Sequence, residues 1–137
     1  MPQLRDYELF ISHSWTYSDA YESLTAKLNE FPNFAWSDHS VPKNDPIHTN
    51  GTDKELYEAI YRKIIGCSCV LILAGVYATY SKWIDKEIEI SKKLNKPIIA
   101  IEPWGAERTS NKVKDSADVV VSFYSPSIIS AIREYSV

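Results

Sequence analysis

The feature that most constrains the fold of this chain is an alternation of short apolar runs with longer amphipathic stretches. Five apolar runs have the length of strands: residues 7–11, 33–37, 67–74, 97–102 and 118–123. Four longer stretches carry apolar side chains at helical spacing: residues 17–31, 52–65, 80–96 and 125–135. This alternation predicts an α/β domain in which a parallel sheet carries helices on both faces.

The strand order expected for such a sheet places a candidate binding site at one of its edges. A five-stranded domain of this kind commonly has the order 2-1-3-4-5. Ligands then bind outside the carboxyl ends of strands one and three, where the strand order reverses. The segments expected at that edge are residues 12–15, 37–38 and 75–80.

Length and charge limit both the number of domains and the kind of partner. The 137 residues are 45% hydrophobic, which is enough for one core, so residues 1–137 are expected to form a single domain. Eighteen acidic and 15 basic side chains give a net charge of -3, and no cluster of Lys and Arg interrupts that balance. We expect no nucleic acid partner, because phosphate binding draws on a concentrated basic face.

Membrane and metal chemistry are not expected either. The longest nearly apolar run, residues 67–80, is too short to cross a bilayer, and the amino terminus lacks the apolar core of a signal peptide. We therefore expect a cytoplasmic protein without membrane contact. Cys67 and Cys69 would point to opposite faces of a strand, which predicts reduced core residues. The three His residues lack the spacing of metal ligands.

The predicted helix over residues 80–96 carries one charge on its apolar side. At about 100° per residue, Glu87 lies at the centre of an arc that spans about 60° on either side of it. The other residues in that arc are Tyr80, Trp83, Ile84, Ile90, Ser91 and Leu94. The remaining charged residues of the stretch fall outside this arc. Glu87 is therefore predicted to be buried.

A buried carboxylate requires either a partner or a function. Burial of an unpaired charge costs several kcal/mol, and it raises the pKa of a carboxyl group, as is common at active sites. From periodicity alone, Glu87 could equally bind a backbone amide or pair with a Lys or Arg of another element. Trp83 lies one turn earlier on the same side of the helix. It is either a core residue or a flat surface for a heterocyclic base.

Several segments together resemble one family, the TIR-like domains of the Thoeris anti-phage type (ThsB-like), which are relatives of Toll/interleukin-receptor domains. The matching segments are residues 7–15, 40–46, 70–77, 81–88 and 96–105. They span nearly the whole chain in the right order, which is more specific than any single motif. The start of the chain is only loosely like that of eukaryotic signalling TIR domains, so no adaptor function is carried over from them.

This resemblance implies a flavodoxin-like three-layer sandwich and an NAD+ glycohydrolase or ADP-ribosyl cyclase activity. The essential glutamate of enzymatic TIR domains lies in a W-x-x-x-E motif on the helix after strand three, and that position is Glu87 here. The resemblance also implies that a cyclic ADP-ribose isomer is made and activates a separate effector protein during phage infection. NAD+ is then a substrate, and no cofactor is expected. TIR–TIR self-assembly into a homo-oligomer is a further expected interaction.

The expected substrate-binding residues come from the matching segments and from the carboxyl edge of the sheet. They are Phe10, Ser12, His13, Ser14, Asp38, Tyr77 and Trp83. The hydroxyls of Ser12 and Ser14 suit ribose or phosphate contacts, although serines at strand ends often satisfy backbone groups. His13 has no acid nearby in the sequence to orient it, which favours a binding or structural role. Asp38 is either a ligand contact or a turn former.

Three other functions remain compatible with parts of the pattern. The first is a non-enzymatic TIR-type interaction module in which Glu87 is structural. The second is a receiver or flavodoxin relative, which is disfavoured because residues 73–75 offer no phosphoacceptor Asp and the first strand lacks an acidic pair. The third is an enzyme like a nucleoside deoxyribosyltransferase. No glycine-rich phosphate loop is present, which disfavours redox use of NAD.

Overall fold

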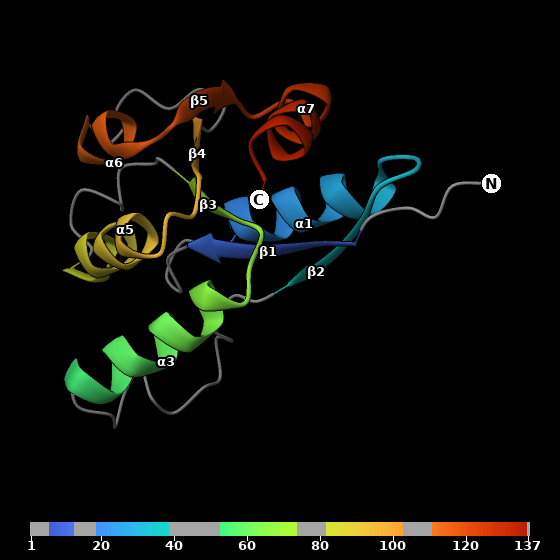
Figure 1. Ribbon diagram of the computed structural model, residues 1–137. Coiled ribbons are helices and arrows are strands. Elements are labelled where there is room, and N and C mark those ends of the chain that lie inside the picture. Colours follow the sequence, from blue (N-terminus) through green and yellow to red (C-terminus); the bar gives the residue numbers. More distant parts are fainter. Residues whose placement is uncertain (1–5, 13–18, 39–52, 74–81, 103–110, 137) are drawn as a thin grey trace.

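The computed structural model describes residues 6–12, 19–38, 53–73, 82–102 and 111–136, and its strands form one parallel sheet (Figure 1). The strands are β1 (Asp6–Ser12), β2 (Ala35–Asp38), β3 (Cys69–Leu73), β4 (Ile98–Glu102) and β5 (Val119–Ser122). Their order is β2-β1-β3-β4-β5, which confirms the predicted topology and places the reversal between β1 and β3.

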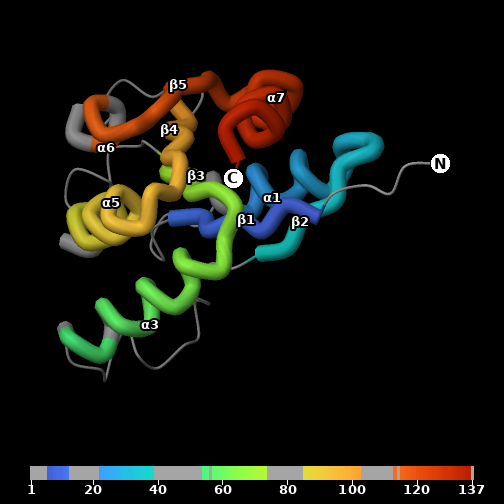
Figure 2. Tube along the Cα trace, in the orientation of Figure 1, coloured from blue at the N-terminus to red at the C-terminus, as the bar shows by residue number. Residues whose placement is uncertain are grey.

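The helices form two groups, one on each face of the sheet. They are α1 (Asp19–Glu30), α3 (Asp53–Ile65), α5 (Lys82–Lys93), α6 (Asn111–Ser116) and α7 (Ser125–Tyr135). Helix α1 contacts α7, whereas α5 contacts both α3 and α6. Figure 2 shows α1 and α7 together on one side of β1, and α3 on the other. The domain is therefore a flavodoxin-like three-layer α/β sandwich, as predicted.

The core is centred on β3 and β4, because each of these strands has a neighbour on both sides and helices on both faces. All five residues of β3 are buried, as are the first four of β4. Strands that are buried on both faces have continuous apolar sequences, without alternation of apolar and polar residues. The flanking helices add their apolar faces, including Leu24 and Leu28 of α1 and Ile60 and Ile64 of α3.

The register between the central strands defines the edge where a ligand is expected. Leu9 of β1 lies opposite Cys69 of β3, and three residues further on Ser12 lies opposite Ile72. Since parallel strands run in the same direction, Ser12 and the end of β3 share the carboxyl edge of the sheet. Helix α5 follows β3 in the chain and packs beside this edge.

Several element boundaries differ from the predicted ones for identifiable reasons. Strand β2 begins at Ala35, because Asn33 has a φ of 58° and turns the chain before it. Cys67 lies before β3, where its amide donates to the carbonyl of Ile64 and continues the end of α3. Both cysteines are buried and unlinked in the core, as expected. The short helix α6 was not predicted.

Helix α5 ends in a motif that sets the path into β4. Asn95 has a φ of 56°, in the left-handed region. Its amide donates to the carbonyl of Lys92 at 3.1 Å, and the amide of Lys96 donates to that of Ser91 at 2.8 Å. These two bonds form a Schellman motif, which satisfies carbonyls left open at a helix end. The chain then turns through Pro97 into β4.

Candidate functional site

Glu87 lies on the buried side of α5, as the helical spacing predicts. Its exposed fraction is 9%, and the side chains of Ile90 and Ser91 on the same side are fully buried. Asp85 and Glu89, two positions to either side, are exposed. This difference follows from a period of 3.6 residues, which separates positions two apart by more than half a turn. The fold therefore buries this one carboxylate of α5.

The partner of the Glu87 carboxylate in the described part of the chain is a hydroxyl group. Ser12, the last residue of β1, donates a hydrogen bond from its Oγ to Oε2 of Glu87, across 75 positions of sequence. Ser12 is itself buried, with an exposed fraction of 3%. The sequence left open whether a cation or a backbone amide compensates the charge of Glu87. In the structure its partner is a neutral side-chain donor on β1.

The environment of Glu87 changes the acidity of its carboxyl group. Burial raises the pKa of Glu87 from 4.5 to about 7, because the ionised form loses its hydration. The hydrogen bond from Ser12 acts in the opposite direction and lowers the pKa, since it favours the ionised form. Glu87 therefore changes its protonation state close to neutral pH.

A second buried serine fixes the backbone of Glu87. The hydroxyl of Ser91 donates a hydrogen bond of 2.7 Å to the carbonyl oxygen of Glu87, one turn earlier in α5. The sequence places Ser91 on the apolar face, but this contact was not predicted. A serine four residues after a buried helical position is the signal that could have indicated it, because such hydroxyls commonly bond back to that carbonyl.

The structure places three of the other predicted substrate-binding residues. Phe10 is 1% exposed and belongs to the core, two residues before Ser12 and on the same face of β1. Asp38 ends β2, is exposed and lies opposite Leu9. The backbone of Trp83 lies in the first turn of α5, one turn before Glu87. Their binding roles stay predictions.

The remaining predicted contacts lie outside the described residues. They are His13, Ser14 and Tyr77.

Within the described ranges, no group of three or more His, Cys, Asp or Glu side chains could hold a metal ion. No helix among those ranges is long and apolar enough to span a membrane. Cys67 is buried, and burial raises the pKa of its thiol to about 11.

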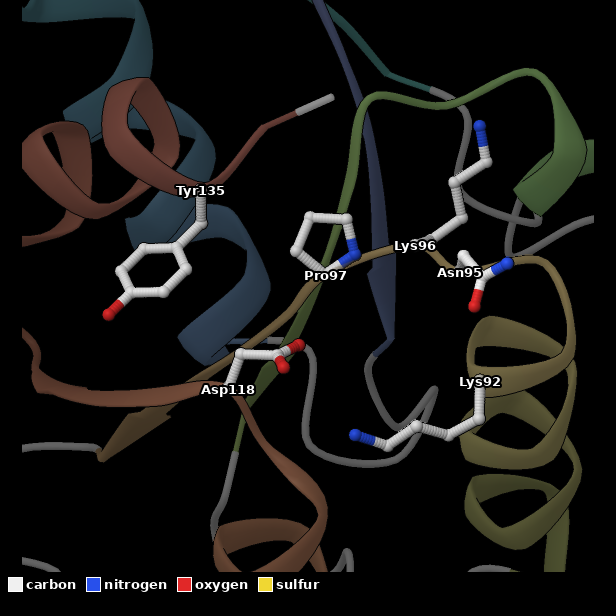
Figure 3. Close-up of a pocket in the computed structure, with 6 residues that line it drawn as sticks. All are labelled: Lys92, Asn95, Lys96, Pro97, Asp118 and Tyr135. Atoms are coloured by element: carbon white, nitrogen blue, oxygen red, sulfur yellow. The ribbon is translucent and has the colours of Figure 1, made fainter.

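A surface pocket of about 290 Å³ lies at the opposite edge of the sheet from Glu87. Its lining comes from the end of α5, the starts of β4 and β5 and the end of α7: Lys92, Asn95, Lys96, Pro97, Asp118 and Tyr135. Figure 3 shows Lys92 reaching toward Asp118. The carboxylate of Asp118 already accepts a hydrogen bond from the amide of Ile98. Neither Glu87 nor Ser12 lines this pocket.

Comparisons with known proteins agree with the fold. A family model described as the TIR-like domain of the Thoeris protein ThsB matches residues 10–108, which include the end of β1 with Ser12 and the whole of β3 and α5. The structure of the CMP N-glycosidase BcmB from Clostridium botulinum has a TM-score of 0.56 at 15% identity, covering 93% of this chain and 99% of that one. At this identity the likeness shows the fold alone. A search of curated proteins gave no match.

Proposed function

The chain belongs to the family of TIR-like domains of the Thoeris protein ThsB, and from this membership we propose that it cleaves the N-glycosidic bond of NAD+, with Glu87 as the catalytic group. The observation that carries the proposal is the burial of the Glu87 carboxylate, with Ser12 as its hydrogen-bond donor at the carboxyl edge of the sheet. A carboxylate kept from water stabilises a nearby positive charge more strongly than an exposed one.

The chemistry of NAD+ requires little more than such a group. When the bond between the ribose C1′ and the nicotinamide nitrogen breaks, its electron pair passes to the pyridinium ring, and neutral nicotinamide leaves without a proton donor. Positive charge then develops on the ribose, as in other glycosidic cleavages with an oxocarbenium-like transition state. The ionised carboxylate of Glu87 binds the ribose hydroxyls and offsets this charge. One acidic residue therefore suffices for the first step.

The second step determines the product. Attack of water on C1′, with loss of a proton, gives ADP-ribose, whereas attack by a ribose hydroxyl of the same molecule gives a cyclic isomer. We propose the cyclic product, with Trp83 stacking on a base and holding the adenine end near C1′. The product would serve as a signal to a separate effector protein in anti-phage defence, as in the family. The remaining predicted contacts, Phe10, His13, Ser14, Asp38 and Tyr77, would hold the substrate.

A nucleoside monophosphate is the second candidate substrate. It is favoured by one observation, the likeness in fold to a protein whose title describes a CMP N-glycosidase. A buried carboxylate beside the ribose suits this reaction as well. However, the leaving base of CMP is neutral in the bound nucleotide and requires protonation, which a single ionised Glu87 would not supply. NAD+ is therefore the better match to the described site.

The test compares three proteins with both substrates. The parent, Glu87→Gln and Glu89→Gln are incubated at high protein concentration with NAD+ or CMP, and the products are separated by chromatography. Glu89 lies two positions from Glu87 on the exposed side of α5, so it controls for the loss of a charge from this helix. We expect nicotinamide from the parent and Glu89→Gln, and a loss of at least a hundred-fold in Glu87→Gln.

The products decide between the alternatives. A cyclic ADP-ribose isomer identifies a cyclase, and ADP-ribose alone identifies a hydrolase. Release of cytosine from CMP without cleavage of NAD+ would replace the proposed substrate. Equal activity of the parent and Glu87→Gln would remove Glu87 from the mechanism. No cleavage of either substrate by the parent would favour a non-enzymatic interaction module in which the Glu87–Ser12 contact is structural.

A further inference from the structure

Two buried serines contact Glu87 from different elements of the fold. The hydroxyl of Ser12 on β1 reaches the side-chain carboxylate, and the hydroxyl of Ser91 on α5 reaches the backbone carbonyl. Both serines are buried, so bulk water does not compete for the donor and acceptor groups of these bonds. The two serines can therefore be compared directly. Both bond to Glu87, but only Ser12 bonds to its carboxylate.

The sheet fixes the position of Ser12. Strand β1 lies between β2 and β3 and pairs with both, and its last residue, Ser12, lies opposite Ile72. A serine side chain has one rotatable bond between Cα and its oxygen, so the hydroxyl has few alternative positions. The Glu87 side chain has three rotatable bonds, and the hydrogen bond from the shorter Ser12 side chain fixes its orientation.

The chemistry of this bond suits a carboxylate that must be ionised. A hydroxyl group has a single proton to donate, and Ser12 donates it to Oε2 of Glu87. A donor at this oxygen stabilises the negative charge against the penalty of burial. The bond occupies one acceptor position of the carboxylate, and an ionised carboxylate has about four of them.

We propose that Ser12 is a positioning residue that keeps the Glu87 carboxylate ionised and in one orientation, without contacting the substrate itself. This role differs from a direct substrate contact, the role expected for Ser12 from the end of its strand. The inference rests on the proposed function for its kinetic test and on the geometry of the described residues for its spectroscopic test. The two tests can therefore fail separately.

The other charges around Glu87 do not take over this role in the described part of the chain. On α5, Asp85 and Glu89 are exposed, and the ammonium of Lys86 lies over the ring of Tyr57 on α3, 5.9 Å from its centroid. Asp115 on α6, the helix packed beside α5, is exposed. Burial and the Ser12 hydroxyl are the causes that act on the pKa of Glu87.

The spectroscopic test measures the ionisation of Glu87 directly. The protein is labelled with ¹³C at the glutamate carboxyls, and the Glu87 signal is identified by its absence in Glu87→Gln. Removal of the donor in Ser12→Ala is expected to raise the pKa of Glu87 by about one pH unit. Ser91→Ala should leave it unchanged, and Ser12→Thr, which keeps the hydroxyl, should restore the parent value. An unchanged pKa in Ser12→Ala would overturn the proposal.

The kinetic test separates positioning from substrate binding. For nicotinamide release, Ser12→Ala is expected to lower kcat about ten-fold at pH 7, to leave KM within about two-fold and to move the rising limb of the pH profile upward. A higher KM with the limb in place would instead identify a substrate contact and overturn the proposal. Ser91→Ala should leave the rising limb of the pH profile in place, because its hydroxyl contacts the backbone of Glu87 and not the carboxylate.

Both tests need variants that are folded. Thermal unfolding shows whether each variant is folded, and Ser12→Cys, which is similar in size and a weak donor, replaces Ser12→Ala if the alanine variant does not fold. The cysteine variant should raise the pKa in the same direction. If the parent does not cleave NAD+ but the pKa rises in Ser12→Ala, the proposed function fails while the hold of Ser12 on Glu87 stands.

Discussion

Asp118 and Ile98 are joined by two hydrogen bonds between neighbouring strands. The Oδ2 atom of Asp118 accepts from the amide of Ile98 at 2.7 Å, and the amide of Asp118 donates to the carbonyl of Ile98 at 2.8 Å. Asp118 precedes β5, and Ile98 is the first residue of β4. The side chain of Asp118 therefore supplies an acceptor to an amide at the start of a buried strand, before the regular ladder begins.

We expect Asp118→Ala to lower the free energy of unfolding by about 1–2 kcal/mol, because it leaves the buried amide of Ile98 without this acceptor. Asp118→Asn keeps an oxygen at the same position and should cost less than half as much. Urea denaturation checks both values. Asp115→Ala, on the exposed side of α6, is the control. Equal stability of all three variants would show that the side-chain bond contributes nothing.

The buried carboxyl of Glu87 should make the stability of the fold depend on pH. Its pKa in the folded protein is about 7, above the ordinary value of 4.5. Below pH 4.5 the group is protonated in both states. As the pH rises to 7, the unfolded chain releases this proton first, so the free energy of unfolding falls, by about 3 kcal/mol once the pH exceeds 7.

Glu87→Gln removes this titration, so it should gain stability over the parent as the pH rises. The difference between the two proteins is expected to grow by about 3 kcal/mol from pH 4 to pH 8. Chemical denaturation at the two pH values measures it, and Glu89→Gln, from the exposed side of α5, should show no such growth. A constant difference between parent and Glu87→Gln would contradict the raised pKa.

The left-handed residue at the end of α5 gives a third prediction. Asn95 has a φ of 56°, a region that favours glycine and tolerates asparagine. Asn95→Ala should therefore cost about 1 kcal/mol, whereas Asn95→Gly should be neutral within about 0.5 kcal/mol. Thermal unfolding measures both. Alanine and glycine variants of equal stability would mean that the helix end relaxes into another conformation.

The helices and the buried acid could be predicted because their signals are local. The 3.6-residue period alone places Glu87 on the buried side of α5, and the apolar runs predict each strand of the sheet within a few residues. Asn33 shortened the second run, because a single left-handed residue interrupts a strand without changing the apolar pattern. Helix α6 has six residues, with Val113 as its buried apolar anchor, which is too little to show a period.

The partner of Glu87 could not be predicted in the same way. Ser12 is 75 positions away, and the contact depends on the register between β1 and β3 and on how α5 packs beside them. None of these is encoded in the spacing of nearby residues. The expected strand order placed Ser12 at the carboxyl edge of the sheet, where it lies in the structure, and its expected role as a substrate contact stays a prediction. The sequence did not predict whether the Ser12 hydroxyl contacts Glu87 or a ligand.

The position of β1 between β2 and β3 determines when Ser12 and Glu87 can come together during synthesis. This strand leaves the ribosome early, but its neighbour β3 and the helix that bears Glu87 follow some 60 to 75 residues later. Pairing of such distant segments is a late event in folding. A nascent or prematurely ended chain that lacks α5 holds Ser12 without its acid. The proposed activity therefore requires synthesis to continue past the end of α5.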